Sequence, residues 1–173
     1  MKPILFDTRE VQATLGGRMT AVRRVIKPQP VIYGLLETYW NWHGIKLTYH
    51  PGDILYVRET WCKGRINGEN ERYFYRADGG REFHCLWSPS TNMPKEAARI
   101  FLRVTDVKVD RLQCITREEA LREGANPACA VMDYKASWNK PIKKADLPVY
   151  GWDANPWVEV TRFERISKEE ALQ

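Results

Sequence analysis

The chain has 173 residues, of which 27 are lysine or arginine and 22 are aspartate or glutamate, so its formal net charge is +5 at pH 7. This length suits one domain with a hydrophobic core and argues against a second complete domain, while the charge favours polyanionic partners. No stretch has the ~18 apolar residues that a membrane span needs, and the N-terminus lacks the basic and then apolar pattern of a signal peptide, so a cytoplasmic protein is expected.

The first predicted elements are a helix and a strand joined by a glycine turn. Asp7 or Thr8 is expected to N-cap a short helix, and Glu10, three residues after Asp7, has the spacing of a capping box. Gly16 and Gly17 end this helix. Residues 18–27 are rich in Thr, Val and Ile and run up to a proline, which predicts a strand.

Four cations follow the glycine turn within ten residues, namely Arg18, Arg23, Arg24 and Lys27. A turn of this kind exposes backbone N–H groups, and guanidinium groups match phosphate oxygens in a bidentate way. The segment is therefore a candidate anion-binding site. The alternative is an ordinary basic strand facing water, because charge runs usually do so.

Further along, strands are expected at residues 53–58, 73–77, 100–109 and 157–166, and a helix at 117–123 behind a capping box of Thr116 and Glu119. Within 100–109 the apolar alternation breaks between Val104 and Val107, which predicts a bulge or bend. Short strands, two short helices and no βαβ alternation predict an α+β, mainly β fold: a small curved β-barrel with helices at its openings.

Two long segments, 31–50 and 127–152, are expected to be irregular insertions within a single domain 1–173. Both are rich in Tyr and Trp, and aromatic rings interleaved with cations are what stacking on nucleic-acid bases requires. The alternative is that most of these rings pack inside the protein. The choice between the two depends on which rings are exposed.

Cofactor chemistry has no support in the sequence. There is no GxxxxGK[ST] or GxGxxG motif, and the four cysteines and three histidines show no metal-site spacing, so neither a cofactor nor a metal is expected. The cysteines are instead expected to be unpaired thiols in a reducing compartment.

Five short motifs, taken in chain order, carry a family resemblance. They are Gly17-Arg18-Met19-Thr20 with Arg23-Arg24, then Pro51-Gly52-Asp53-Ile54-Leu55, Val57-Arg58-Glu59-Thr60-Trp61, Trp87-Ser88-Pro89-Ser90, and Gly151-Trp152-Asp153-Ala154-Asn155-Pro156-Trp157. Together they resemble the ASCH domain family of PUA-like β-barrels, in particular the ASCH-like proteins encoded by bacteriophages and prophages. The resemblance covers nearly the whole chain and implies a cleft that accepts RNA, single strands or a modified nucleobase.

The resemblance also implies a reaction that this chain is poorly equipped to perform. Some family members hydrolyse N4-acylated cytidine with a lysine, a threonine and a glutamate, and the corresponding positions here are Met19, Val22 and Glu123. Neither a thioether nor an isopropyl group takes up a proton or attacks a carbonyl. Thr20 shares a strand face with Val22, opposite to Met19, and is the nearest substitute hydroxyl. Met19 and Val22 are instead expected to form the apolar floor of a base pocket.

Two sets of candidate residues result. The catalytic candidates, if the protein is an enzyme, are Glu123, Thr20 and Glu59, of which Glu59 is either a general base or the ion-pair partner of an arginine such as Arg23 or Arg24. The binding candidates are Arg18, Met19, Val22, Arg23, Arg24, Lys27, Trp61, Tyr75, Arg76, Trp87 and Trp152.

Three functions remain open. The first is binding of RNA, single-stranded nucleic acid or a modified nucleoside. The second is an N4-acylcytidine amidohydrolase or a ribonuclease with a rearranged site. The third is a phage factor that covers a host protein with exposed aromatic patches at 39–42 and 134–138. Whether those patches are exposed separates the third function from the others.

Overall fold

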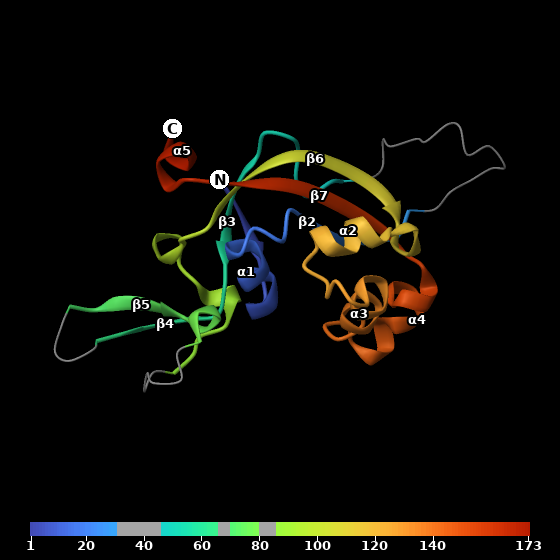
Figure 1. The fold of residues 1–173 in the computed structure, drawn as a ribbon, viewed down its shortest axis with the longest axis horizontal. Helices are drawn as coiled ribbons and strands as arrows, with labels where there is room; N and C mark the ends of the chain where they lie inside the picture. Colours follow the sequence, from blue (N-terminus) through green and yellow to red (C-terminus); the bar gives the residue numbers. More distant parts are fainter. Residues whose placement is uncertain (31–45, 66–69, 80–85) are drawn as a thin grey trace.

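A five-stranded sheet with a long, arched pair of central strands forms the frame of the molecule (Figure 1). The computed structural model describes residues 1–30, 46–65, 70–79 and 86–173. The strands, in sheet order, are β1 (Lys2–Leu5), β3 (Ile54–Arg58), β6 (Phe101–Arg111), β7 (Trp157–Ile166) and β2 (Ala21–Val25). Only β1 and β3 pair in parallel. A separate hairpin consists of β4 (Trp61–Gly64) and β5 (Arg72–Tyr75). The α+β, mainly β fold class is thereby confirmed.

The predicted break in the longest strand is a bulge. Val104 pairs with Phe163 and Asp106 pairs with Arg162, so Thr105 is an extra residue in β6. Such an insertion bends the strand and increases its twist. The bulge therefore contributes to the arch of β6 and β7 seen in Figure 1.

The first hydrophobic core shows how far the sheet curls. Its buried side chains come from all five strands and from α1 (Thr8–Leu15), and they include Ile4, Leu55, Val57, Leu102, Val104, Phe163, Val22 and Val11. α1 begins at the predicted capping box, in which Asp7 accepts from the Glu10 N–H and Glu10 accepts from the Asp7 N–H. One face of the sheet thus wraps around a single short helix.

A second hydrophobic core lies on the opposite face of β7. Val158 and Val160 pack there against α2 (Arg117–Arg122) and α3 (Ala130–Trp138). The predicted capping box of α2 is present, with Thr116 as N-cap and Glu119 as its partner. Because Thr161 and Phe163 point to the other face, β7 is buried on both sides.

The expectation that 127–152 is an irregular loop is wrong. α3 and α4 (Leu147–Tyr150) occupy much of it, and the rings of Tyr134 and Trp138 lie 6.1 Å apart while those of Tyr134 and Trp152 lie 6.4 Å apart. These rings are packed in the second core, which supplies the apolar contact that a helix with little amphipathic patterning needs. The other expected insertion, 31–50, lies outside the described residues except for 46–50, which contain no helix or strand.

The described residues also contain several short helical elements. They are α5 (Lys168–Leu172) and the 3₁₀ turns η2 (Arg76–Asp78), η3 (Ser90–Asn92), η4 (Lys95–Ala97), η5 (Leu112–Cys114), η6 (Lys144–Asp146) and η7 (Trp152–Ala154). Cys62 is disulfide-bonded, which corrects the expectation of an unpaired thiol there, whereas Cys114 and Cys129 are free. In the described parts of the chain no helix has the length and apolar character needed to cross a bilayer.

A glycine in the left-handed region fixes how closely α1 and α2 approach. Gly124 follows α2 with φ +80°, and a Cβ added there would lie 2.9 Å from the Cβ of Ala13. Gly17 has φ +69°, but a Cβ added there would meet no atom within 4 Å.

We therefore expect Gly124→Ala to lower the free energy of unfolding by about 2–4 kcal/mol and Gly17→Ala by about 1–2 kcal/mol. Both substitutions place a Cβ on a left-handed backbone, and only Gly124→Ala also adds a clash. Urea denaturation measures both losses. Equal losses would contradict the close packing of α1 against the end of α2.

Candidate functional site

The glycine turn after α1 does not offer its amides to a ligand. The N–H groups of Gly16 and Gly17 donate to the carbonyls of Gln12 and Thr14, and those of Arg18 and Met19 both donate to the Ala13 carbonyl. These bonds cap the C-terminal end of α1, where the helix dipole is negative. The expectation that this backbone holds an anion is wrong, because the helix end uses its donors.

Met19 and Val22 do not form the floor of a base pocket either. Their exposed fractions are 3% and 2%, and both belong to the first core. The expected alternation of Met19 and Thr20 fails because Met19 makes only an isolated bridge to Glu123, and β2 begins two residues later. Thr20 is exposed beside this bridge.

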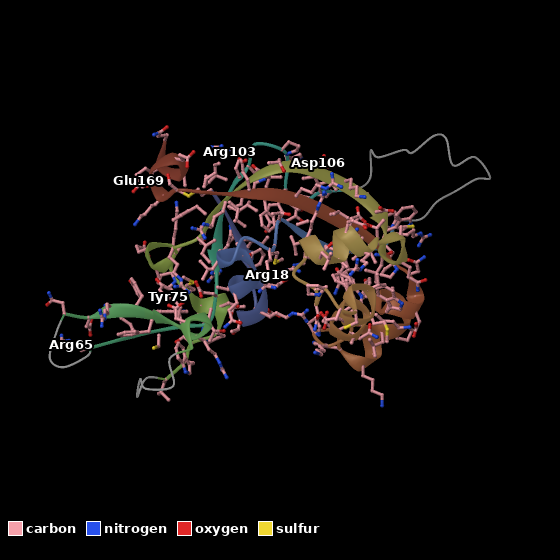
Figure 2. The ribbon with its side chains drawn as sticks, in the orientation of Figure 1. Arg18, Arg65, Tyr75, Arg103, Asp106 and Glu169 are labelled. Atoms are coloured by element: carbon pink, nitrogen blue, oxygen red, sulfur yellow. The ribbon has the colours of Figure 1, made fainter. Side chains whose placement is uncertain are left out.

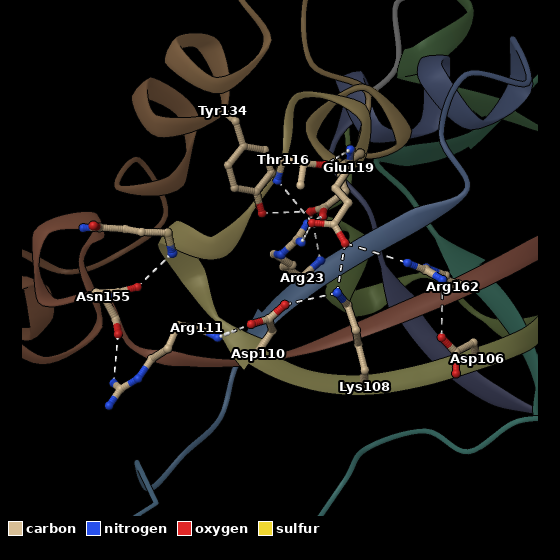
Figure 3. A network of polar contacts seen from close by, with 12 residues as sticks. Arg23, Asp106, Lys108, Asp110, Arg111, Thr116, Glu119, Tyr134, Asn155 and Arg162 are labelled. Carbon is tan, nitrogen blue, oxygen red and sulfur yellow. Dashed lines mark hydrogen bonds and ion pairs between the residues drawn. The ribbon is translucent and has the colours of Figure 1, made fainter. Parts of the chain in front are cut away.

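Arg23 is at the centre of a polar network between the sheet and the helices (Figure 3). Its side chain is completely buried, and its guanidinium donates to Glu123 Oε1 and, at 2.7 Å, to Glu119 Oε2. It therefore contacts no phosphate at the surface, contrary to the sequence-based expectation. Its Nε is buried with no hydrogen-bond partner.

The Glu123 carboxylate is fully engaged by this network. Oε2 accepts from the Tyr134 hydroxyl at 2.8 Å and from the Arg23 N–H at 3.1 Å, and the side chain is 3% exposed. Burial raises the pKa of Tyr134, which keeps its hydroxyl a donor. A carboxylate that is buried and held by a guanidinium and a phenol has no free oxygen for a ligand.

Glu119 extends the network along β6 and β7. Its Oε1 accepts from Lys108 Nζ at 2.9 Å and lies 3.7 Å from Arg162, and Lys108 also donates to Asp110. Burial opposes ionisation of Glu119, but the hydrogen bonds from Lys108 and the Thr116 N–H and the charge of Arg23 outweigh it and lower its pKa to about 2. Glu119 is thus charged at neutral pH, and the network joins β2, β6, β7, α2 and α3.

Three exposed arginines from different elements meet around the same turn. Arg18 lies in the turn itself. Arg122 is the last residue of α2, and its carbonyl accepts from the Thr20 N–H at 2.8 Å. Arg165 of β7 donates to the Leu15 carbonyl at 3.4 Å. Among the described residues none of the three is ion-paired with a carboxylate. Figure 2 shows Arg18 beside α1. Sequence reasoning missed Arg122 and Arg165, since only the register of β7 and the end of α2 bring them here.

Two other predicted cations are exposed but engaged. Arg24 donates to the Leu5 carbonyl and to Glu10 Oε1, both at 3.0 Å. Lys27 lies over the Tyr150 ring, 4.4 Å from its centre. Trp152 is 7% exposed within the second core, so it is a packing residue and not a stacking surface.

The remaining candidates lie at the β4–β5 hairpin, apart from the turn. Glu59 is buried and holds Arg99 in a bidentate pair of 2.9 and 3.0 Å, which confirms an ion pair but with a partner other than Arg23 or Arg24. Burial raises the pKa of Glu59, partly offset by Arg99. The others placed here are Trp61, Tyr75, Arg76 and the half-buried Trp87. In the described residues no three His, Cys, Asp or Glu side chains are grouped as metal ligands.

Comparison with known proteins gives a weak structural likeness. No family model and no curated protein matches the chain. A solved structure that is similar is the crystal structure of protein EF3133 from Enterococcus faecalis V583, of family model DUF984. The two share 11% identity, the match covers 96% of this chain and 82% of that one, and the TM-score is 0.49. A likeness at this level carries no conclusion about function.

Removing the central cation tests the network. Arg23→Met is expected to lower the free energy of unfolding by about 3–5 kcal/mol, because it leaves the Glu123 carboxylate, which is 3% exposed, without its cation and removes one of the cations that hold Glu119. Arg24→Met, which breaks an exposed pair, should cost less than about 1 kcal/mol. Chemical denaturation measures both, and Glu123→Gln added to Arg23→Met should recover part of the loss. Similar losses for the two arginines would contradict the burial of Arg23.

The low pKa of Glu119 predicts a specific acid sensitivity. Since the folded-state pKa of about 2 lies below the ordinary 4.5, the unfolded chain binds the proton more readily. The stability that Glu119 contributes is therefore complete above pH 4.5 and is lost as the pH falls toward 2. Glu119→Gln should remove this component, so its stability should fall less steeply than that of the native chain. Parallel pH profiles of the two would refute the prediction.

Proposed function

We propose that the protein binds single-stranded nucleic acid, with RNA as the expected ligand, through the basic surface around the turn after α1. The observation that carries the proposal is the meeting of Arg18, Arg122 and Arg165 from three elements, each exposed and without a carboxylate partner in the described residues. Guanidinium groups are suited to bidentate contact with phosphate. Because the backbone N–H groups of the turn already donate to carbonyls of α1, the proposed contacts to phosphate are made by side chains.

The proposal includes a PUA-like curved barrel of the ASCH type. The sheet ends at β1 and β2, and side chains bridge these two edges: Arg24 of β2 donates to the Leu5 carbonyl of β1 at 3.0 Å. Tyr49 donates its hydroxyl to the Pro3 carbonyl at 2.8 Å, while its N–H donates to Glu159 of β7 at 3.2 Å. These contacts, with the shared first core, support a sheet rolled toward a barrel.

The other two functions have less support. Glu123 is occupied by Arg23 and Tyr134, so no contact favours the amidohydrolase or ribonuclease alternative. A phage factor with an exposed patch at 134–138 is disfavoured because Tyr134 is 8% exposed and Trp138 packs against the second core. The patch at 39–42 lies outside the described residues.

Salt-dependent binding tests the proposal. A labelled single-stranded RNA should bind in fluorescence anisotropy, and Arg18→Gln with Arg122→Gln and Arg165→Gln should reduce the slope of log K against log salt by about 2, because each phosphate contact to a single strand contributes about 0.7. A single-stranded DNA of the same sequence reports the preference for RNA.

The matched control removes three exposed cations elsewhere. Lys140→Gln with Lys143→Gln and Lys144→Gln makes the same change in net charge; the three lysines are exposed and none is paired with a described carboxylate. An equal effect of both variants would mean that total charge, not this surface, holds RNA. No binding of the native chain at low salt would refute the proposal.

A further inference from the structure

The hairpin and the outer face of β3 place aromatic rings over one apolar layer. Four half-buried rings pack against the third core, whose members include Met93, Ala97 and Phe101. The rings are Tyr56 of β3, Trp61 of β4, and Tyr73 and Tyr75 of β5. Trp61 pairs with Tyr75 and Lys63 pairs with Tyr73, so the hairpin residues share one face. None of these rings belongs to the network around Arg23.

The four rings are not equally available. Tyr75 is occupied, since its hydroxyl donates to the Ala97 carbonyl at 2.7 Å and the Arg99 guanidinium covers its ring at 3.9 Å. Trp61 meets Tyr73 edge to face, with 5.6 Å between ring centres. The Tyr56 and Tyr73 hydroxyls have no hydrogen-bond partner among the described residues. Trp61 and Tyr75 thus support a surface on which Tyr56 and Tyr73 remain accessible.

Charge at these rings favours a polyanion. Lys95 lies 6.0 Å from the centre of the Tyr56 ring and is paired with no described carboxylate. The described hairpin residues 61–65 and 70–79 carry four cations, Lys63, Arg65, Arg72 and Arg76, and two acids, Glu71 and Asp78. Glu71 is paired with Lys63 at 2.8 Å and Asp78 with Arg99 at 2.8 Å, and Glu96 is the exposed acid next to Lys95. Among the described residues of the hairpin and of η4, cations therefore outnumber acids.

We propose that Tyr56 and Tyr73 form a stacking platform for the bases of the single strand whose phosphates the turn arginines hold. This inference rests on the proposed function and adds the ligand's bases to it. α1 lies between the two places: Gln12 donates to the Ala77 carbonyl of η2 at 2.9 Å, and the arginine turn follows the same helix. Half-exposed aromatic rings beside cations match the stacking and phosphate contacts of sequence-tolerant single-strand binding.

The test compares two ligands of equal charge. A labelled single-stranded RNA and an abasic strand of the same length are titrated against the native chain and against Tyr56→Leu with Tyr73→Leu, a change that keeps apolar bulk over the third core. The native chain should bind the strand with bases more tightly. Since a stacked base contributes about 1–3 kcal/mol, the variant should lose roughly 5-fold to 150-fold in affinity for that strand only. Its affinity for the abasic strand should not change.

The control and the other outcomes keep the two proposals apart. Tyr150→Leu removes a half-buried ring beside a cation, Lys27, at a distant place and should leave both affinities unchanged. Equal binding of both strands by the native chain, or no effect of the variant on the strand with bases, overturns the platform while leaving the phosphate surface in place. Binding of neither strand overturns both. Urea denaturation tests whether the double variant is folded. If the double variant is unfolded, Tyr73→Leu alone replaces it in the titrations and should also weaken binding of the strand with bases only.

Discussion

The ion pair between Arg23 and Glu123 is the contact on which the arrangement of sheet and helices depends. Arg23 reaches from the edge strand β2 to the end of α2, and Tyr134 of α3 donates to the same carboxylate. Beside this ion pair, Glu119 forms ion pairs with Lys108 of β6 and Arg162 of β7. One buried guanidinium thus ties three strands to two helices. Its replacement affects them together, because the Glu123 carboxylate left behind is only 3% exposed.

A buried ion pair is better understood as a device for specificity than as a source of stability. Removing charges from water costs several kcal/mol per ion, and the attraction between them offsets this cost only when every group finds a partner. Here the partners are nearly complete, with the Arg23 Nε as the exception. A network this constrained admits one placement of α2 and α3 on the sheet. That placement carries Arg122 to the turn after α1.

Local rules predicted the parts of this fold that depend on near neighbours. The capping boxes of α1 and α2 and the bulge in β6 follow from spacings of a few residues, so the sequence was sufficient. The burial of Arg23 was not predictable, since it depends on Glu123, one hundred residues away. The helices in 127–152 were missed because tertiary contacts of Tyr134 and Trp152, and not periodicity, hold them. The basic surface was only partly found, because Arg165 reaches the turn through the register of β7 and Arg122 through the position of the end of α2.

Met19 and Val22, which differ from the residues that the ASCH resemblance implies at these positions, are explained by the same packing. Met19 and Val22 are buried in the first core, where a lysine ammonium or a threonine hydroxyl would need a hydrogen-bond partner. The nearby carboxylate, Glu123, already accepts from Arg23 and Tyr134. A lysine at position 19 would therefore compete with Arg23 for one acceptor, whereas a methionine fills the space without a polar demand. Met19, Val22 and the buried Arg23 therefore fit one packing arrangement. The exposed arginines around the turn are its charged groups.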